Sequence, residues 1–153
     1  MTHLKRINAP RSWPIERRIR KFVAKPLPGT HKLAESMPLG VILREMLRIG
    51  KEKREIKIIL NNKSILIDNK IRKEFRFPVG IFDSLSIPKL NKHFRITYNK
   101  KGDLDLVEIS KEDSEHKTCK IIGKTVLKKG KTQLNLSDGR NIIVDKDALK
   151  VRD

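Results

Sequence analysis

The sequence is poor in cysteine, in aromatic residues and in long apolar runs. Of its 153 residues one is a cysteine and 5% are aromatic. A lone cysteine, Cys119, excludes an internal disulfide and a cysteine-rich zinc site, and we expect an intracellular chain. No run of 18 apolar residues occurs and no apolar segment follows the N-terminus, so we expect neither a membrane span nor a secretory signal. With so few aromatic residues, the core should consist of Ile, Leu and Val.

Acidic residues are also scarce. The chain carries 36 Lys and Arg residues against 18 Asp and Glu, a net charge of +18. The excess lies mainly in residues 1–100, because residues 101–153 hold 12 basic and 10 acidic groups. A lysine-rich solvated surface would also be basic, but such an imbalance costs stability through self-repulsion unless an anion offsets it. We therefore expect a polyanionic partner, and a nucleic acid rather than a membrane.

Catalytic patterns are missing as well. The sequence has no glycine-rich phosphate loop, nucleophile elbow or paired metal ligands. The four histidines are scattered, while Asp68 and Asp83 lie at positions that turn and strand chemistry explains. General acid roles for these two aspartates are the less favoured alternative. We predict no enzyme activity, no cofactor, no metal and no small-molecule substrate.

Residues 1–36 form a basic N-terminal arm that contains four prolines. Proline removes backbone donors and disfavours helix before itself, so only Ile15–Val23 is predicted to form a short helix. A segment this charged should be disordered alone and order on RNA. Trp13 has two interpretations, packing on the domain surface or stacking on a base. The basic residues of the arm are Lys5, Arg6, Arg11, Arg17, Arg18, Arg20, Lys21, Lys25 and Lys32.

Two amphipathic helices are predicted next, over Pro38–Ile49 and Glu52–Leu60. In the first, Leu39, Ile42, Leu43, Met46 and Leu47 form an apolar stripe. Arg44 and Arg48, four residues apart, should share a stripe outside the core. In the second helix Arg54 and Lys57 lie beside the apolar stripe and Lys53 lies at its border.

From Ser64 onward the apolar period changes to two, which predicts strands. Asp68-Asn69 and Asp138-Gly139 have hairpin-turn chemistry, Lys129-Gly130 should form another turn, and Phe77–Gly80 also reads as a turn. Strands are expected at 64–67, 70–72, 83–87, 94–98, 104–109, 117–127, 132–136 and 141–144, and Glu108–Glu115 as a turn or short helix. The fold class is α+β, with the arm, residues 37–110 as a module of two helices and short strands, and residues 111–153 as an antiparallel β-rich domain.

Several short motifs occur in order along essentially the whole chain. The longer ones are His3–Arg6, Ala9–Pro14, Pro28–Leu33, Phe77–Gly80, Gln133–Leu136 and Asp138–Asn141, and the shorter ones include Arg72-Lys73 and Cys119-Lys120. As a set, these motifs resemble the archaeal and eukaryotic (e-type) small-subunit ribosomal protein four family.

This resemblance implies an alpha-L RNA-binding module and a following hairpin over 37–110, preceded by the arm and followed by a central β-domain. The predicted helix pair and the hairpin over Ser64–Arg72 align with the module. It implies a non-catalytic, cytoplasmic component of the ribosome that binds small-subunit ribosomal RNA beside neighbouring ribosomal proteins. The alternative is a free RNA-binding stress or quality-control factor built on the same module. The predicted RNA-contacting residues are Lys5, Arg6, Arg11, Arg17, Arg18, Arg20, Lys21, Arg44, Arg48, Lys53, Arg54, Lys57, Lys70, Arg72, Lys73 and Arg76.

The family normally continues past the positions matched by Leu149–Arg152 into the rest of the central domain and a C-terminal SH3-like barrel. We expect this chain to lack that part, either as a natural short version or as a fragment. The last β-domain is then expected to have an unpaired edge that RNA or a neighbouring protein covers.

Overall fold

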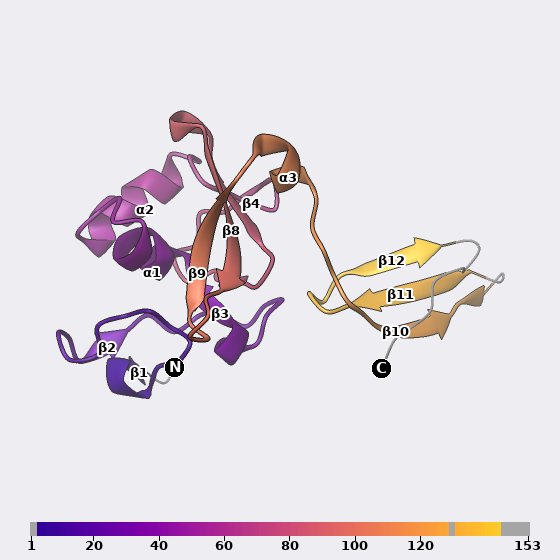
Figure 1. The fold of residues 1–153 in the computed structure, drawn as a ribbon, viewed down its shortest axis with the longest axis horizontal. Coiled ribbons are helices and arrows are strands. Elements are labelled where there is room, and N and C mark those ends of the chain that lie inside the picture. The colour runs from indigo at the N-terminus through magenta and orange to yellow at the C-terminus, as the bar shows by residue number, and fades with distance from the viewer. Residues whose placement is uncertain (1–2, 129–130, 145–153) are drawn as a thin grey trace. The chain divides into compact units, whose positions relative to one another are not determined.

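The computed structural model describes residues 3–128 and 131–144 and divides the chain into two compact units (Figure 1). The first unit runs to Lys117 and the second begins at Thr118. The first unit extends past residue 110 because the short helix α3 (Lys111–Glu115) belongs to it. The guanidinium of Arg95 donates hydrogen bonds to the carbonyls of Asp113 and His116, which join this helix to the sheet. Helices and antiparallel sheets together make an α+β fold, as predicted.

The first predicted helix is shorter and less regular than expected. Helix α1 (Leu39–Val41) continues into a π-helical turn, Ile42–Met46. The amide of Leu47 donates to the carbonyl of Ile42 at 3.1 Å, and Arg48 then adopts a positive φ of 52°. Arg44 and Arg48 therefore do not share the α-helical stripe predicted from their spacing.

The second predicted helix is confirmed as α2 (Lys53–Asn61). A capping box explains its start, because the side chains of Glu52 and Glu55 each accept from the backbone amide of the other. Ile56 and Leu60 are fully buried, whereas Arg54 and Lys57 are exposed. The apolar stripe of this helix is thus the one the sequence predicted.

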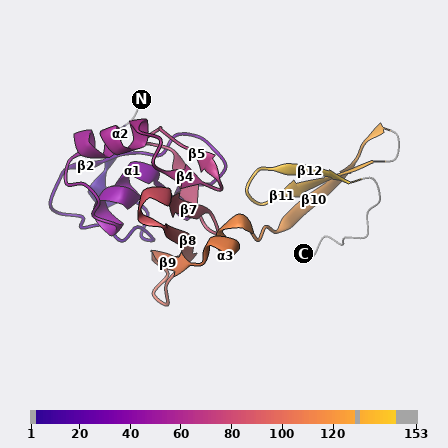
Figure 2. The same cartoon turned by 90° about the horizontal axis from the view of Figure 1, so that it is seen from above.

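The described residues of the first unit form a five-stranded antiparallel sheet, and α1 and α2 lie on the same side of it in both views (Figures 1 and 2). Asp68 and Asn69 make the two-residue turn between the first two strands, with positive φ values of 47° and 59°. This geometry confirms the predicted hairpin. The strands in spatial order are β5 (Lys70–Ile71), β4 (Leu66–Ile67), β7 (Ser84–Ile87), β8 (Lys92–Tyr98) and β9 (Leu104–Ile109).

The turn predicted at Phe77–Gly80 is wrong. Pro78–Gly80 is strand β6, which pairs antiparallel with β3 (Ser36–Pro38) and places Ser36 opposite Gly80. The two prolines sit opposite each other in this two-stranded ribbon, where no ladder bond from their nitrogens is needed. A Cβ on Gly80 would lie 2.3 Å from the ring of His31, so only glycine fits this position.

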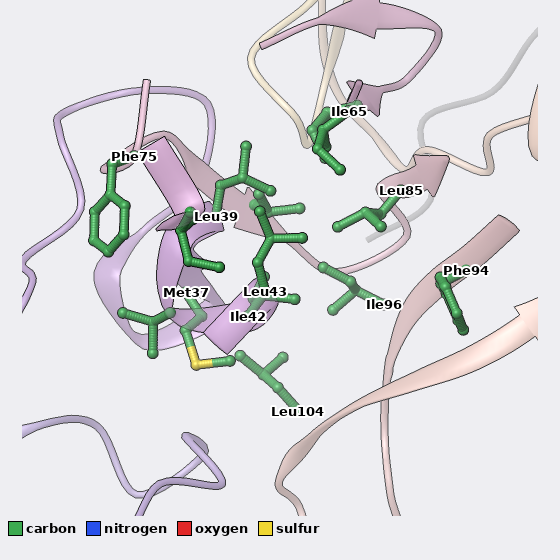
Figure 3. Close-up of a cluster of buried hydrophobic side chains, with 14 of the residues drawn as sticks. Met37, Leu39, Ile42, Leu43, Ile65, Phe75, Leu85, Phe94, Ile96 and Leu104 are labelled. Carbon is green, nitrogen blue, oxygen red and sulfur yellow. The ribbon is translucent and has the colours of Figure 1, made fainter. Parts of the chain in front are cut away.

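The core lies between the helices and the sheet and is mainly aliphatic, as the composition predicted (Figure 3). Leu39, Ile42 and Leu43 from the helical segment have 1% exposure or less, and they pack in one cluster with residues of the sheet. Phe75 closes the cluster over Gly40, where a Cβ would lie 2.1 Å from its ring. Ile65, which directly precedes β4, belongs to the same cluster, as do the sheet residues Leu85, Phe94, Ile96 and Leu104.

The N-terminal arm is folded, which corrects the prediction of disorder. Strands β1 (Leu4–Lys5) and β2 (Phe22–Val23) pair antiparallel, and the helix predicted over Ile15–Val23 is absent. Trp13 is 2% exposed, and its indole N–H donates to the carbonyl of Ser36 at 2.8 Å. Stacking of Trp13 on a base is therefore excluded. Proline and charge did not prevent folding here, because buried apolar groups and side-chain donors stabilise the irregular backbone.

The second unit is a three-stranded antiparallel sheet in its described residues. At the Asp138-Gly139 turn, Gly139 has a φ of 76° and Asp138 pairs with Arg140 at 3.2 Å. The predicted turn at Lys129-Gly130 lies outside the described residues. The strands, in spatial order, are β10 (Ile121–Val126), β11 (Thr132–Leu136) and β12 (Asn141–Val144), so the last two have the predicted bounds.

Candidate nucleic-acid interface

Two adjoining hollows separate the arm from the helical segment of the first unit, and both have basic linings. One has a volume of about 350 Å³ and the other about 460 Å³, and they share Arg20 and Arg44. We call the two hollows together the basic groove. Its Arg and Lys residues are Arg6, Arg20, Lys25, Arg44, Arg48, Lys51, Lys53 and Arg76, and its carboxylates are Glu16 and Glu45.

Residues from distant parts of the sequence meet in this groove. Arg20 and Lys25 flank strand β2, whereas Arg44 comes from the π-helical turn. Arg76 precedes β6, and its Nε donates to the carbonyl of Lys25 at 2.7 Å, which holds the arm against that segment. The pairing of β1 with β2 thus brings the basic part of the arm to the helices.

Glu45 is the acidic centre of the groove. Its Oε1 accepts from Arg6 at 3.1 Å and from Arg44 at 2.8 Å. Burial by itself would raise the pKa of Glu45, but the hydrogen bonds and positive charges of the two arginines outweigh burial and lower the pKa below its ordinary value. Glu45 is therefore ionised at neutral pH and neutralises part of the charge of its two partners.

We expect Glu45→Gln to destabilise the protein by about 1.5 kcal/mol at pH 7, since charged hydrogen bonds to Arg6 and Arg44 are lost. The lowered pKa of Glu45 means that its contribution is complete above its ordinary pKa and disappears as the pH falls through the folded-state value. Urea unfolding over a series of pH values from 7 into acid should show the stabilities of the two proteins converging once the pH falls below the ordinary pKa of Glu45. The exposed Glu108→Gln is the control, and a gap that stays constant with pH would contradict the assignment.

The structure divides the predicted contact residues between the interior and the surface. Arg6 is 1% exposed, so we remove it from the proposed contacts. Arg17 donates to the carbonyls of Ala9 and Pro10, each at 2.8 Å, and we assign it to holding the arm. Half-buried Arg72 lies over the ring of Phe77 at 4.4 Å.

The remaining predicted residues fall into a groove set and an outer set. Arg20, Arg44, Arg48, Lys53 and Arg76 line the groove. Lys5, Arg18 and Lys21 line a separate shallow hollow of the arm together with Arg17 and Arg20. Outside these hollows the exposed members are Arg11, Arg54, Lys57, Lys70 and Lys73.

Two residues that line the groove, Lys25 and Lys51, are absent from the predicted RNA-contacting residues. Lys25 follows β2 and precedes a proline, and Lys51 lies just before the capping box of α2. Neither occupies a periodic position in a helix or strand. Their charge was the only available signal, and it is shared with many other residues of this chain.

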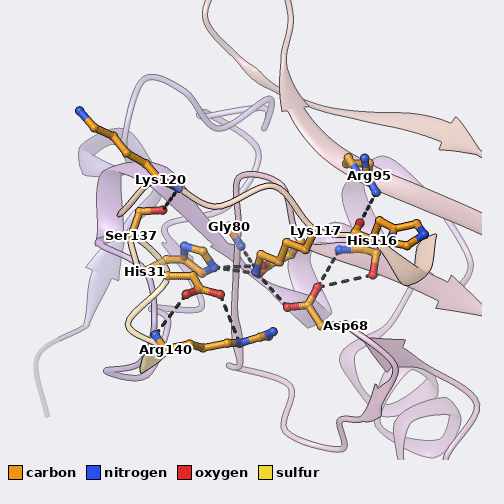
Figure 4. A network of polar contacts seen from close by, with 12 residues as sticks. His31, Asp68, Gly80, Arg95, His116, Lys117, Lys120, Ser137 and Arg140 are labelled. Carbon is orange, nitrogen blue, oxygen red and sulfur yellow. Dashed lines mark hydrogen bonds and ion pairs between the residues drawn. The ribbon is translucent and has the colours of Figure 1, made fainter. Parts of the chain in front are cut away.

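A second polar cluster forms around Asp83, which directly precedes β7, and brings together His31, Gly80, Lys117 and Asp68 (Figure 4). The carboxylate of Asp83 contacts the Nε2 of His31 at 2.9 Å, accepts from the amide of Gly80 at 2.9 Å and pairs with Lys117. Lys117 also contacts Asp68 at 2.9 Å. Burial alone would lower the pKa of Lys117, but the two carboxylates outweigh burial and raise the pKa.

Within residues 3–128 and 131–144, no group of three or more His, Cys, Asp or Glu residues is arranged to hold a metal ion. Over the same residues no helix combines the length and the apolar character needed to cross a membrane.

Comparison with known proteins places these features in a family. The model of the ribosomal family S4e matches residues 90–153, and that of the RS4NT (NUC023) domain matches residues 2–34. Small ribosomal subunit protein eS4 from Methanosphaera stadtmanae is 52% identical over 95% of this chain and 60% of its own length. The corresponding protein from Methanocella arvoryzae is 46% identical over 95% and 61%. The chain thus spans about three fifths of the length of these curated relatives.

A solved structure agrees with the sequence matches. The crystal structure of the 30S ribosomal protein S4e from Thermoplasma acidophilum covers 76% of this chain, with a TM-score of 0.64 and 32% identity, and the match spans 60% of that chain. The matched models, the relatives and the shared fold confirm the resemblance found in the sequence, and the chain belongs to the ribosomal S4e family.

Proposed function

We propose that this protein is a structural, non-catalytic component of the small ribosomal subunit that binds and stabilises ribosomal RNA beside neighbouring ribosomal proteins in the cytoplasm. The observation that carries the proposal is the basic groove, whose lining contains eight Arg and Lys residues but only two residues with carboxylates. The names of the relatives, small ribosomal subunit protein eS4, support the ribosomal component over the free RNA-binding factor.

The chemistry of the groove suits an RNA backbone. Glu45 offsets part of the charge of Arg6 and Arg44, which leaves Arg20, Arg48 and Lys51 as cations that form no ion pair with a carboxylate of the described residues. Each phosphate neutralised by such a side chain releases counterions, so binding should weaken steeply with salt. We propose that the exposed cations of α2 and β5 also contact RNA, and we retain residues 37–110 as the proposed RNA-binding module and following hairpin.

Charge removal inside the groove tests the proposal. We expect Arg20→Gln with Lys51→Gln to weaken binding to small-subunit ribosomal RNA and to reduce the slope of log affinity against log salt by about two, roughly one for each lost phosphate contact. The affinity is measured by fluorescence anisotropy over a series of KCl concentrations.

A matched control comes from the turn between β8 and β9. Lys100→Gln with Lys101→Gln removes the same charge from two exposed residues outside the groove, and it should leave the salt slope almost unchanged. Equal losses in the two variants would show that only net charge matters and would contradict the groove. Sedimentation of the tagged protein with small subunits after a high-salt wash tests the ribosomal assignment separately.

A further inference from the structure

One part of the basic groove differs from an ordinary phosphate-binding surface. The hollow of about 350 Å³ has an apolar floor of Leu4, Val23 and Ala24, with Phe22 and Phe75 also in its wall. Its volume is in the range of small-ligand sites. A surface that bound phosphates alone would need no such floor.

The two phenylalanines have different exposures. Phe75 is 4% exposed and belongs to the core, whereas Phe22 is 47% exposed. The ring of His3 lies 5.4 Å from that of Phe22, tilted by 48°. Phe22 therefore presents aromatic surface at a hollow and has a second ring beside it.

Cations surround these rings. Lys21 Nζ lies 5.4 Å from the centre of the Phe22 ring, and Lys53 Nζ lies 5.4 Å from that of Phe75. Arg20 and Arg44 line the same hollow. Aromatic surface for a base and positive charge for the phosphates on its two sides thus occur in one place.

We infer that this hollow takes a single unstacked nucleotide of the bound RNA, with its base against Phe22 and its flanking phosphates near Arg20 and Lys53. This inference rests on the proposed RNA-binding function and adds base capture to backbone binding. Proteins recognise RNA loops and bulges by stacking splayed bases on aromatic or guanidinium planes. Bases that are paired within a duplex are not free to stack on a side chain in this way. The probe must therefore separate an extruded base from a duplex.

Three RNA probes make the distinction: a plain duplex, the same duplex with one bulged adenosine, and the same bulge without its base. We expect the bulged RNA to bind about tenfold more tightly than either of the others, since one stacked base contributes about that factor. Equal affinity for the adenosine and abasic bulges would overturn base capture while leaving RNA binding intact. Absence of binding to all three would instead contradict the proposed function.

Phe22→Ala should lose the tenfold preference for the adenosine bulge. Phe22→Leu keeps apolar volume in β2 but has no aromatic face, so it should lose the preference too, and it serves as the test if the alanine variant does not fold. Tyr98→Ala, which removes a similarly exposed aromatic residue from β8, should keep it. A preference that survives both Phe22 variants would overturn the assignment.

Competition separates a nucleotide within a strand from a free nucleotide. Adenosine monophosphate at millimolar concentration should leave the bulged RNA bound, because the strand adds phosphate contacts that the free nucleotide lacks. Displacement at micromolar adenosine monophosphate would identify a free-nucleotide site and overturn the inference.

Discussion

Replacing Asp83 by alanine is expected to lower the free energy of unfolding by about 3–5 kcal/mol, the usual cost of removing one partner of a buried ion pair. The Asp83 side chain is 3% exposed and serves three groups at once, Lys117, His31 and the amide of Gly80. Its loss leaves a buried amide without its acceptor and deprives Lys117 of one of two carboxylates. Because the raised pKa keeps Lys117 charged until the pH passes its folded-state pKa, the loss should be present throughout the neutral range.

Urea denaturation followed by circular dichroism measures this effect, and a fall in Tm of roughly 10 °C should accompany it. Glu108→Ala removes an exposed carboxylate from β9 and is expected to change stability by less than about 0.5 kcal/mol. A similarly small change for Asp83→Ala would mean that the network adds little to stability. His31→Ala should have an intermediate effect, because Lys117 and the Gly80 amide keep their acceptor.

Local chemistry made part of this fold predictable. The Asp68-Asn69 turn follows from residues that tolerate positive φ, and α2 begins where Glu52 and Glu55 cap each other. Both features depend on residues within a few positions of one another. The π-helical turn after α1, in which the amide of Leu47 donates to the carbonyl of Ile42, has no such marker in the local sequence. Its residues Ile42 and Leu43 pack in the core with residues of the sheet that are distant in sequence.

The arm was misjudged because its folding depends on remote contacts. The composition of the arm shows its positive charge, but part of that charge lies on side chains that form contacts inside the protein. Arg6 pairs with Glu45, which lies 39 residues away, and Arg17 donates to the backbone carbonyls of Ala9 and Pro10. No local pattern marks these two arginines as different from Arg18 or Arg20.

The same limit applies to the groove. An excess of Lys and Arg predicted a polyanion-binding surface, and Arg44 and Arg48 were selected from helical spacing. They do line one hollow, but the π-helical turn and the positive φ of Arg48 bring them there, not a shared α-helical stripe. Their contact with RNA stays a prediction. The surface becomes a groove only because the arm, whose strands β1 and β2 pair with each other, lies against a helical segment that is distant in the sequence.

Replacing Trp13 by alanine should destabilise the first unit by about 3–5 kcal/mol, because a buried tryptophan leaves a large cavity. The indole is 2% exposed and donates to the carbonyl of Ser36, the first residue of β3. Strand β3 in turn pairs with β6, so the loss should extend beyond the arm. Urea unfolding of the variant, followed by circular dichroism of the whole chain, measures the change.

Ile19→Ala is the control within the arm, since Ile19 is 64% exposed and should cost little. Trp13 is the only tryptophan of the chain, so its fluorescence reports on the arm alone. In the wild type the fluorescence shift and the loss of circular dichroism from the first unit should coincide in urea, because arm and core share one hydrophobic cluster. A fluorescence transition at much lower urea, with a Trp13→Ala variant as stable as the wild type, would show that the arm unfolds independently of the core.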